Sequence, residues 1–300
     1  MSITLRPLNE QVMVITGASS GIGLATAEAA AQQGAKLVLA ARSEQTMEDV
    51  VARLSAAGAD AVFVPADVGQ RDQVERIATE AIARFGRIDT WVNNAGVSIY
   101  GRLDEITEED SRRLFDTNFW GVVSGSLVAL QHLRTSGGAI INVGSEVSDA
   151  VVPLQGMYSA SKHAVKGFTD ALRVEIQEVD QAPVAITLIQ PTAVDTPFPQ
   201  HGRNYMEREP KLPTPQIDPG KVAEAILEAA VDPTREKKVG AMAKINAAVA
   251  KISPALANKM EAKQAERQQY DEPPRDPEGT LYKPGESGQK HGSGGRVDRH

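Results

Sequence analysis

Short apolar runs alternate with longer amphipathic segments along most of this chain, and this alternation constrains its fold more than any other feature. The apolar runs are VMVIT, KLVLA, AVFVP, RIDTWVNN, GAIINVGS and VAITLIQP. Apolar residues at helical spacing predict helices between them, from residues 22 and 44 and over 70–84, 109–133 and 158–179. Repeated strand and helix units predict an α/β fold of three layers, with helices on both faces of a doubly wound parallel sheet.

The pattern changes after the last apolar run. Residues 196–220 are rich in proline and polar residues, and an irregular segment of this length is typical of a lid or a binding loop. A helix over 219–230 and a polar strand within 235–242 follow. We therefore predict one catalytic domain over residues 1–240.

The last sixty residues carry two further patterns. Over 241–270, apolar residues at helical spacing predict an amphipathic helical extension. Its apolar face is expected to pack on the domain or on another subunit, and a membrane surface or a partner protein is the alternative. Residues 271–300 are dominated by proline, glycine and charged residues, which predicts a disordered, mobile tail. The apolar residues of this tail are Leu281, Tyr282 and Val297.

Composition narrows the choice of partners. A net charge of −7 over 300 residues argues against nucleic acid and disfavours an anionic membrane surface. No cysteine is present, so thiolate nucleophiles and cysteine metal sites are excluded, and the five histidines show no ligand spacing that predicts a metal site. Neither a signal peptide nor a long apolar span is found, and we expect a cytoplasmic protein that acts on a small molecule.

A glycine-rich turn, TGASSGIG, joins the first apolar run directly to a helix. Backbone N–H groups at a helix N-terminus bind a pyrophosphate when the backbone can approach it closely, and glycine permits that approach. Three residues separate the first two glycines, so the turn matches the dinucleotide fingerprint in mechanism but not in spacing. A plain tight turn is the alternative. The residues assigned here to a cofactor are Gly17, Ser19, Ser20, Gly21, Ile22 and Gly23.

The second apolar run ends in Ala41 and Arg42, where an NAD site usually has a carboxylate that holds the ribose hydroxyls. Arginine offers a charged planar fork suited to a 2′-phosphate, which favours NADP(H). A solvated surface arginine is the alternative. Glu44 lies close enough to reach the ribose, but acidic residues are common in a first helical turn.

Two further strand ends carry cofactor candidates. Asp67 and Val68 follow the third run and are expected near the adenine, and Asn94, Ala95 and Gly96 leave room for the nucleotide after the fourth. The alternatives are a cap for Asp67 and a turn for the Asn-Ala-Gly segment.

Tyr158 and Lys162 stand four residues apart at the start of a predicted helix and share one face of it. A free phenol has a pKa of about 10, and a neighbouring ammonium together with a bound nicotinamide is expected to lower it. Ser145, at the end of the fifth run, is expected to hydrogen-bond a substrate oxygen, with a capping role as the alternative. Asn118 is a poor helix former inside a predicted helix, and we expect it to hold a water behind Lys162.

Taken together, these motifs resemble those of the short-chain dehydrogenase/reductase family over about residues 10–235. The resemblance implies a Rossmann-like domain in which Tyr158 is the acid/base and Lys162 also binds the nicotinamide ribose. It further implies that Ser145 orients the carbonyl, that Asn118 supports a proton-relay water, and that Arg42 marks an NADP preference.

The segment after the sixth run also resembles that family. There the resemblance implies that Pro191, Val194 and Thr196 contact the nicotinamide, whereas Thr192 replaces the glycine that the family usually has. Relatives commonly pair through the helices expected at 109–133 and 158–179, which implies a homodimer or homotetramer.

The predicted function is hydride transfer between NADP(H) and a carbonyl or secondary alcohol, and the substrate is left open. The alternative is an NADP(H)-binding sensor or scaffold without turnover. His201 and Arg203 are weaker candidates for substrate contacts. Apolar candidates for the substrate pocket are Ile99, Tyr100, Val147, Val152, Leu154 and Phe198.

Overall fold

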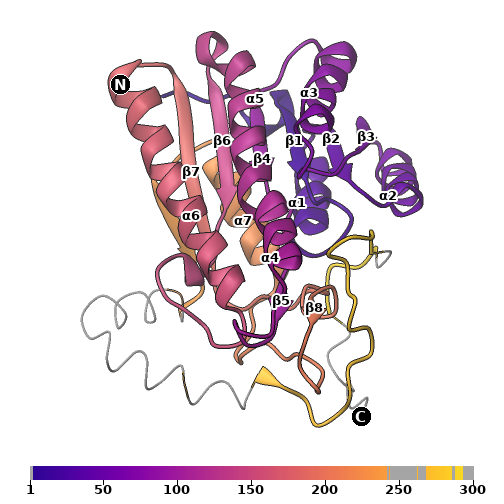
Figure 1. The fold of residues 1–300 in the computed structure, drawn as a ribbon. Coiled ribbons are helices and arrows are strands. Elements are labelled where there is room, and N and C mark those ends of the chain that lie inside the picture. Colours follow the sequence, from indigo (N-terminus) through magenta and orange to yellow (C-terminus); the bar gives the residue numbers. More distant parts are fainter. Residues whose placement is uncertain (1–2, 242, 244–261, 263–267, 286–287, 293–300) are drawn as a thin grey trace.

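A computed structural model describes residues 3–241, 243, 262, 268–285 and 288–292. Seven parallel strands form the main sheet in the order β3-β2-β1-β4-β6-β7-β9, so the doubly wound prediction is confirmed (Figure 1). The strand order reverses between β1 and β4, where ligands bind in sheets of this kind. The strands are β1 Val12–Thr16, β2 Lys36–Ala41, β3 Ala61–Pro65, β4 Thr90–Asn93, β6 Gly138–Val143, β7 Val184–Pro191 and β9 Glu236–Val239.

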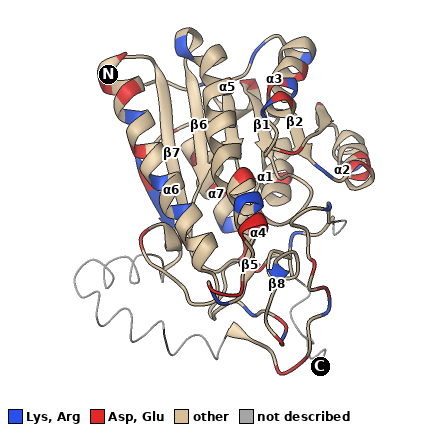
Figure 2. Ribbon diagram, viewed as in Figure 1, with Lys and Arg blue, Asp and Glu red and all other residues tan. Residues whose placement is uncertain are grey.

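Helices cover both faces of this sheet. One apolar cluster joins one sheet face to α1 (Gly21–Gln32), α2 (Glu44–Ala56) and α7 (Pro219–Ala229). A second joins the other face to α3 (Arg71–Phe85), α5 (Gly121–Ser136) and α6 (Gly156–Arg173). Charged residues gather on the helices and loops and are almost absent from the central strands, because those strands are buried on both sides (Figure 2).

The helix expected over 109–133 is interrupted. It forms as α4 (Glu108–Phe115), a π-helical turn (Asp116–Trp120) and α5. A π-helical turn inserts one residue into the helical repeat, and such turns are frequent at functional sites. Here the turn carries Asn118, whose side chain is fully buried. The helix expected over 158–179 ends in a second π-helical turn, Val174–Val179.

The segment 196–220 forms the predicted irregular lid. Its one described strand, β8 (Arg203–Asn204), pairs with β5 (Ile99–Tyr100) outside the main sheet. Both short strands lie beyond the carboxyl ends of the main strands, at the lower end of the view in Figure 1. The lid therefore lies beside the carboxyl edge of the main sheet, where the sequence motifs are located.

The described residues 268–285 near the C-terminus are irregular and contact the domain. Residues 268–285 run back along the lid, and Leu281 is completely buried against the domain (Figure 1). One buried leucine and several hydrogen bonds connect these residues to the domain, and the mobility expected for residues 271–300 stays a prediction. Most of the predicted amphipathic extension, 241–270, lies outside the described residues. Within the described parts of the chain, no helix combines the length and apolar character that a membrane crossing requires.

Candidate active site

A cavity opens at the carboxyl ends of β1, β2, β3, β4, β6 and β7, and it brings together nearly all the residues that the sequence singled out. Of the residues predicted to be catalytic or to bind the cofactor, Asn118 and Gly23 do not line it. Those that do are Gly17, Ser19, Ser20, Gly21, Ile22, Arg42, Asp67, Val68, Asn94, Ala95, Gly96, Ser145, Tyr158, Lys162, Pro191, Val194 and Thr196.

The glycine-rich turn is packed so tightly that its glycines cannot be replaced. A Cβ on Gly23 would lie 2.1 Å from the carbonyl oxygen of Gly17, and Gly17 itself has a φ of +67°. The Asn94 side chain donates to the carbonyls of Thr16 and Gly17 at 3.0 and 3.2 Å. Ser20 precedes α1 without capping it through its side chain. The turn thus holds the N-terminus of α1 at the cavity, an arrangement that fits a pyrophosphate.

The end of the cavity near β2 and β3 contains a charged cluster that the sequence revealed only in part. Asp67 accepts a hydrogen bond from the backbone N–H of Gly69 at 2.9 Å, which is the turn-capping role weighed above. It also forms an ion pair with Arg113 of α4, a residue that sequence reasoning missed because it lies 46 positions away. Arg42 lines the same region.

Tyr158 and Lys162 lie in the first turns of α6. The Nζ atom of Lys162 donates to the backbone carbonyl of Val143 at 2.8 Å and lies 5.7 Å from the centroid of the Tyr158 ring. Burial lowers the pKa of the Lys162 ammonium to about 8. Burial also raises the pKa of the Tyr158 phenol to about 12, while a hydrogen bond with Ser145 acts in the opposite direction. The lowering of the Tyr158 pKa expected with a bound nicotinamide stays a prediction.

Ser145 has the capping role that the sequence left open. Its Oγ accepts from the backbone N–H of Val147 at 3.3 Å and caps a short 3-10 turn, Glu146–Ser148. Ser145 also lines the cavity beside Tyr158. Capping fixes the serine next to the Tyr158 hydroxyl, and its contact with a substrate oxygen stays a prediction.

Asn118 is held differently from what we expected. Its Oδ1 accepts from the backbone N–H of Val97 at 2.8 Å, and its Nδ2 donates to the Val97 carbonyl at 2.9 Å and to Ser161 Oγ at 3.1 Å. The side chain therefore braces the segment after β4 behind the cavity wall. Its part in a water relay stays a prediction.

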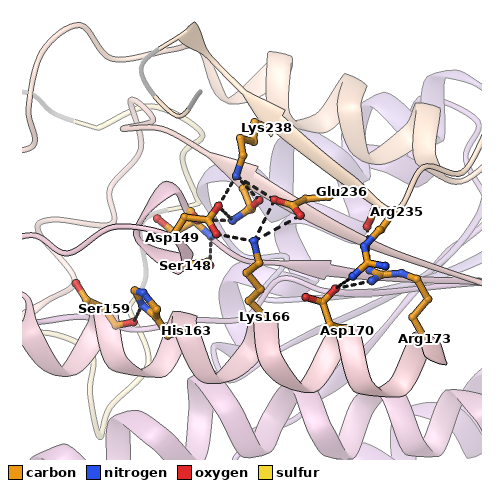
Figure 3. Close-up of polar contacts among 12 residues, drawn as sticks. Ser148, Asp149, Ser159, His163, Lys166, Asp170, Arg173, Arg235, Glu236 and Lys238 are labelled. Carbon is orange, nitrogen blue, oxygen red and sulfur yellow. Dashed lines mark hydrogen bonds and ion pairs between the residues drawn. The ribbon is translucent and has the colours of Figure 1, made fainter. Parts of the chain in front are cut away.

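An ion-pair network that the sequence did not indicate holds the loop after Ser145 in place. Asp149 accepts from Lys166 of α6 and Lys238 of β9, and from Gln190 of β7 at 2.9 Å (Figure 3). Burial raises the pKa of the Asp149 carboxyl, but these hydrogen bonds outweigh burial and lower that pKa to about 2. Residues from three elements thus converge on one carboxylate, and no local pattern could have predicted this.

The substrate end is partly apolar. Of the predicted pocket residues, Val147, Val152 and Phe198 line the cavity. The centroids of the Phe198 and Tyr158 rings lie 5.5 Å apart. Ile99 and Tyr100 are buried, and neither they nor Leu154 belong to the lining.

Polar residues complete this end of the cavity. Thr192, which replaces the usual glycine, donates to Glu146 at 3.1 Å, so its extra side chain is accommodated. His201 of the lid lines the cavity, while Arg203 pairs with Asp110 of α4 instead. His163 is exposed, with Nδ1 2.9 Å from the Ser159 carbonyl (Figure 3), and the described residues contain no metal-binding cluster.

Comparison with solved structures finds the same architecture bound to nicotinamide nucleotides. A short chain dehydrogenase/reductase from Burkholderia phymatum in complex with NAD is 28% identical, with a TM-score of 0.73, over 91% of this chain and 99% of that one. An alcohol dehydrogenase from Thermococcus sibiricus complexed with 5-hydroxy-NADP is 30% identical, with a TM-score of 0.66, over 76% of this chain and 94% of that one.

Comparison of amino-acid sequences also finds oxidoreductases. An uncharacterized oxidoreductase of Bacillus subtilis, YxnA, is 44% identical over 94% of this chain and 81% of its own length. An 11-beta-hydroxysteroid dehydrogenase A from Sesamum indicum is 39% identical over 65% of this chain and 55% of its own length. The family model for short chain dehydrogenases matches residues 11–206. On this match and on the shared fold, the chain belongs to the short-chain dehydrogenase/reductase family of oxidoreductases.

Proposed function

We propose that this protein transfers a hydride between NADP(H) and a carbonyl or secondary alcohol, with Tyr158 as the general acid and base. The observation that carries the proposal is a single cavity. It holds Ser145, Tyr158 and Lys162 at one end, Arg42 at the other, and the N-terminus of α1 along its wall. That layout matches a dinucleotide whose nicotinamide lies beside the tyrosine.

The nicotinamide, when bound, supplies or accepts the hydride. In the reductive direction the Tyr158 hydroxyl donates its proton to the substrate oxygen, and its pKa of about 12 keeps it protonated near neutrality. The Ser145 hydroxyl donates a hydrogen bond to the same oxygen. Lys162, with a pKa of about 8, is mostly an ammonium at pH 7 and stabilises the phenolate that forms. Oxidation of an alcohol runs the same steps in reverse.

Arg42 supports NADP(H) over NAD(H). The end of β2 has no carboxylate to hold ribose hydroxyls, and a guanidinium fork suits a 2′-phosphate. The two solved relatives carry an NADP derivative and NAD respectively, so the likeness to them favours neither nucleotide. The assignment therefore depends on Arg42.

A homo-oligomer is the second part of the proposal. Large apolar side chains are exposed on the side of the molecule where α5 and α6 cover the sheet. Such a cluster is unusual for a surface that contacts only water. They are Trp120, Leu127, Val174 and Val179. Pairing of two such faces would bury them.

The test combines turnover with binding. Purified protein is mixed with NADPH and a panel of aldehydes and ketones, while NADPH binding is followed by its fluorescence. Turnover of an aldehyde or ketone from the panel supports the proposed oxidoreductase activity. Tight NADPH binding without turnover of any substrate favours the sensor, and the absence of binding contradicts both.

A further inference from the structure

The C-terminal strap, which we define as residues 276–285, reaches the nucleotide cavity from the far end of the chain. Its residues Thr280, Pro284 and Gly285 line that cavity together with Arg42. In Figure 1 this segment passes below α4 and beside β8. The strap is therefore a wall of the cavity that the family's sequence motifs do not include.

A buried side chain anchors the strap. Leu281 is 0% exposed and packs against Val97, Ile99 and Leu114. One residue further on, the Tyr282 hydroxyl donates to Asp110 at 2.7 Å. These contacts dock the strap on α4 and on the segment after β4.

Arg42 is the main polar partner of the strap. Its Nη1 donates to the Leu281 carbonyl at 3.2 Å, and its Nη2 donates to the Thr280 carbonyl. Arg113 donates to the same Leu281 carbonyl at 3.1 Å. A guanidinium has five N–H donors, so the strap orients Arg42 and leaves donors for another ligand.

The charge balance of this region favours an anion. Two guanidinium groups, of Arg42 and Arg113, meet one carboxylate, Asp67. Burial, together with the charge of Arg113, lowers the pKa of Arg42 in spite of Asp67. A doubly charged phosphate monoester would offset this excess positive charge.

We propose that the strap is part of the nucleotide site: it closes over the 2′-phosphate end of bound NADP(H), orients Arg42 toward that phosphate, and must undock before the nucleotide leaves. This rests on the proposed function, in which NADP(H) occupies the cavity. The alternative is that the strap carbonyls compete with the phosphate for Arg42. The strap carbonyls accept only two of the five N–H donors of Arg42, which leaves donors for a phosphate and favours closure.

The experiment measures NADPH affinity and its dissociation rate in the full-length protein by fluorescence and stopped flow. Leu281→Ala removes the buried anchor, and Tyr282→Phe removes only the hydrogen bond to Asp110. We expect both to release NADPH faster, Tyr282→Phe by about tenfold, with a matching loss of affinity. NADH, which has no 2′-phosphate for the oriented Arg42, is expected to change less.

Leu103→Ala is the matched control, because this leucine is 62% exposed and is not part of the apolar cluster that contains Leu281. If Leu281→Ala fails to fold, Tyr282→Phe decides alone. Wild-type release rates in Tyr282→Phe overturn the proposal, and so does tighter NADPH binding, which would identify the strap as a competitor. Failure of the wild-type protein to bind NADPH overturns the proposed function instead.

Discussion

Tyr158 is the proposed acid, and its surroundings keep the phenol protonated well above neutral pH. Burial holds the phenol pKa at about 12, Ser145 hydrogen-bonds the hydroxyl, and Lys162 is fixed nearby through Val143. The three residues therefore act as one unit, and removal of the tyrosine oxygen removes the proton path without changing the cavity wall.

Tyr158→Phe is expected to lower kcat by about 10²- to 10⁴-fold, the usual contribution of a general acid. NADPH affinity should remain within about twofold, because the aromatic ring still lines the cavity. Steady-state assays and fluorescence titration measure the two quantities. Tyr270→Phe, in the C-terminal extension, is the control. A Tyr158→Phe variant with wild-type turnover would remove Tyr158 from the mechanism.

Arg42 has two partners in the proposed complex, the strap and the 2′-phosphate. Arg42→Ala is expected to weaken NADPH binding by about 1.5–3 kcal/mol, or roughly 10- to 150-fold, because a charge-assisted contact is lost. NADH should lose much less. Titration of both nucleotides checks this, with Arg53→Ala, an exposed arginine of α2, as the control. Equal losses for the two nucleotides would contradict the NADP assignment.

At the scale of secondary-structure elements, Asp149 joins the turn after β6 to α6, β7 and β9. Lys166, Lys238 and Gln190 all contact this carboxylate, and Gln190 also donates to the carbonyl of Ser145 at 3.4 Å. The network thus helps to fix the backbone that carries Ser145.

Asp149→Asn is expected to lower the free energy of unfolding by about 1–3 kcal/mol at pH 7. The folded-state pKa of about 2 lies below the ordinary value of 3.8. The contribution of the carboxylate is therefore complete above about pH 4 and is lost as the pH falls toward 2.

Urea titrations of both proteins between pH 7 and pH 2.5 test this dependence. Asp180→Asn, which removes a more exposed ion pair with Arg134, is the control and should change stability by less than about 1 kcal/mol. Equal urea midpoints for Asp149→Asn and the wild type at pH 7 would show that the network contributes nothing to stability.

At the scale of the whole molecule, the exposed apolar face predicts association. Trp120 is 54% exposed in the π-helical turn before α5. Trp120→Glu is expected to weaken self-association by about 30-fold or more, the usual effect of losing an interface tryptophan. Light scattering over a concentration series measures this. Val231→Glu, beside α7 on the opposite face of the sheet, is the control, and a monomeric wild-type protein would refute the prediction.

The sequence by itself determined the order of the main strands and helices along the chain, the glycine-rich turn before α1 and the placement of Tyr158 and Lys162 on one helix face. These features depend on residues close together in the chain, where periodicity and spacing can be seen directly. Most of the predicted site residues meet at one sheet edge because parallel strands bring their carboxyl ends together.

Only the tertiary structure decided what surrounds these motifs. Arg42 meets carbonyls 238 and 239 positions away, Arg113 reaches Asp67, and Asn118 braces Val97. Contacts over such separations leave no local pattern. Composition averages over the last thirty residues and could not show that one of them, Leu281, packs in an apolar cluster beside the cavity.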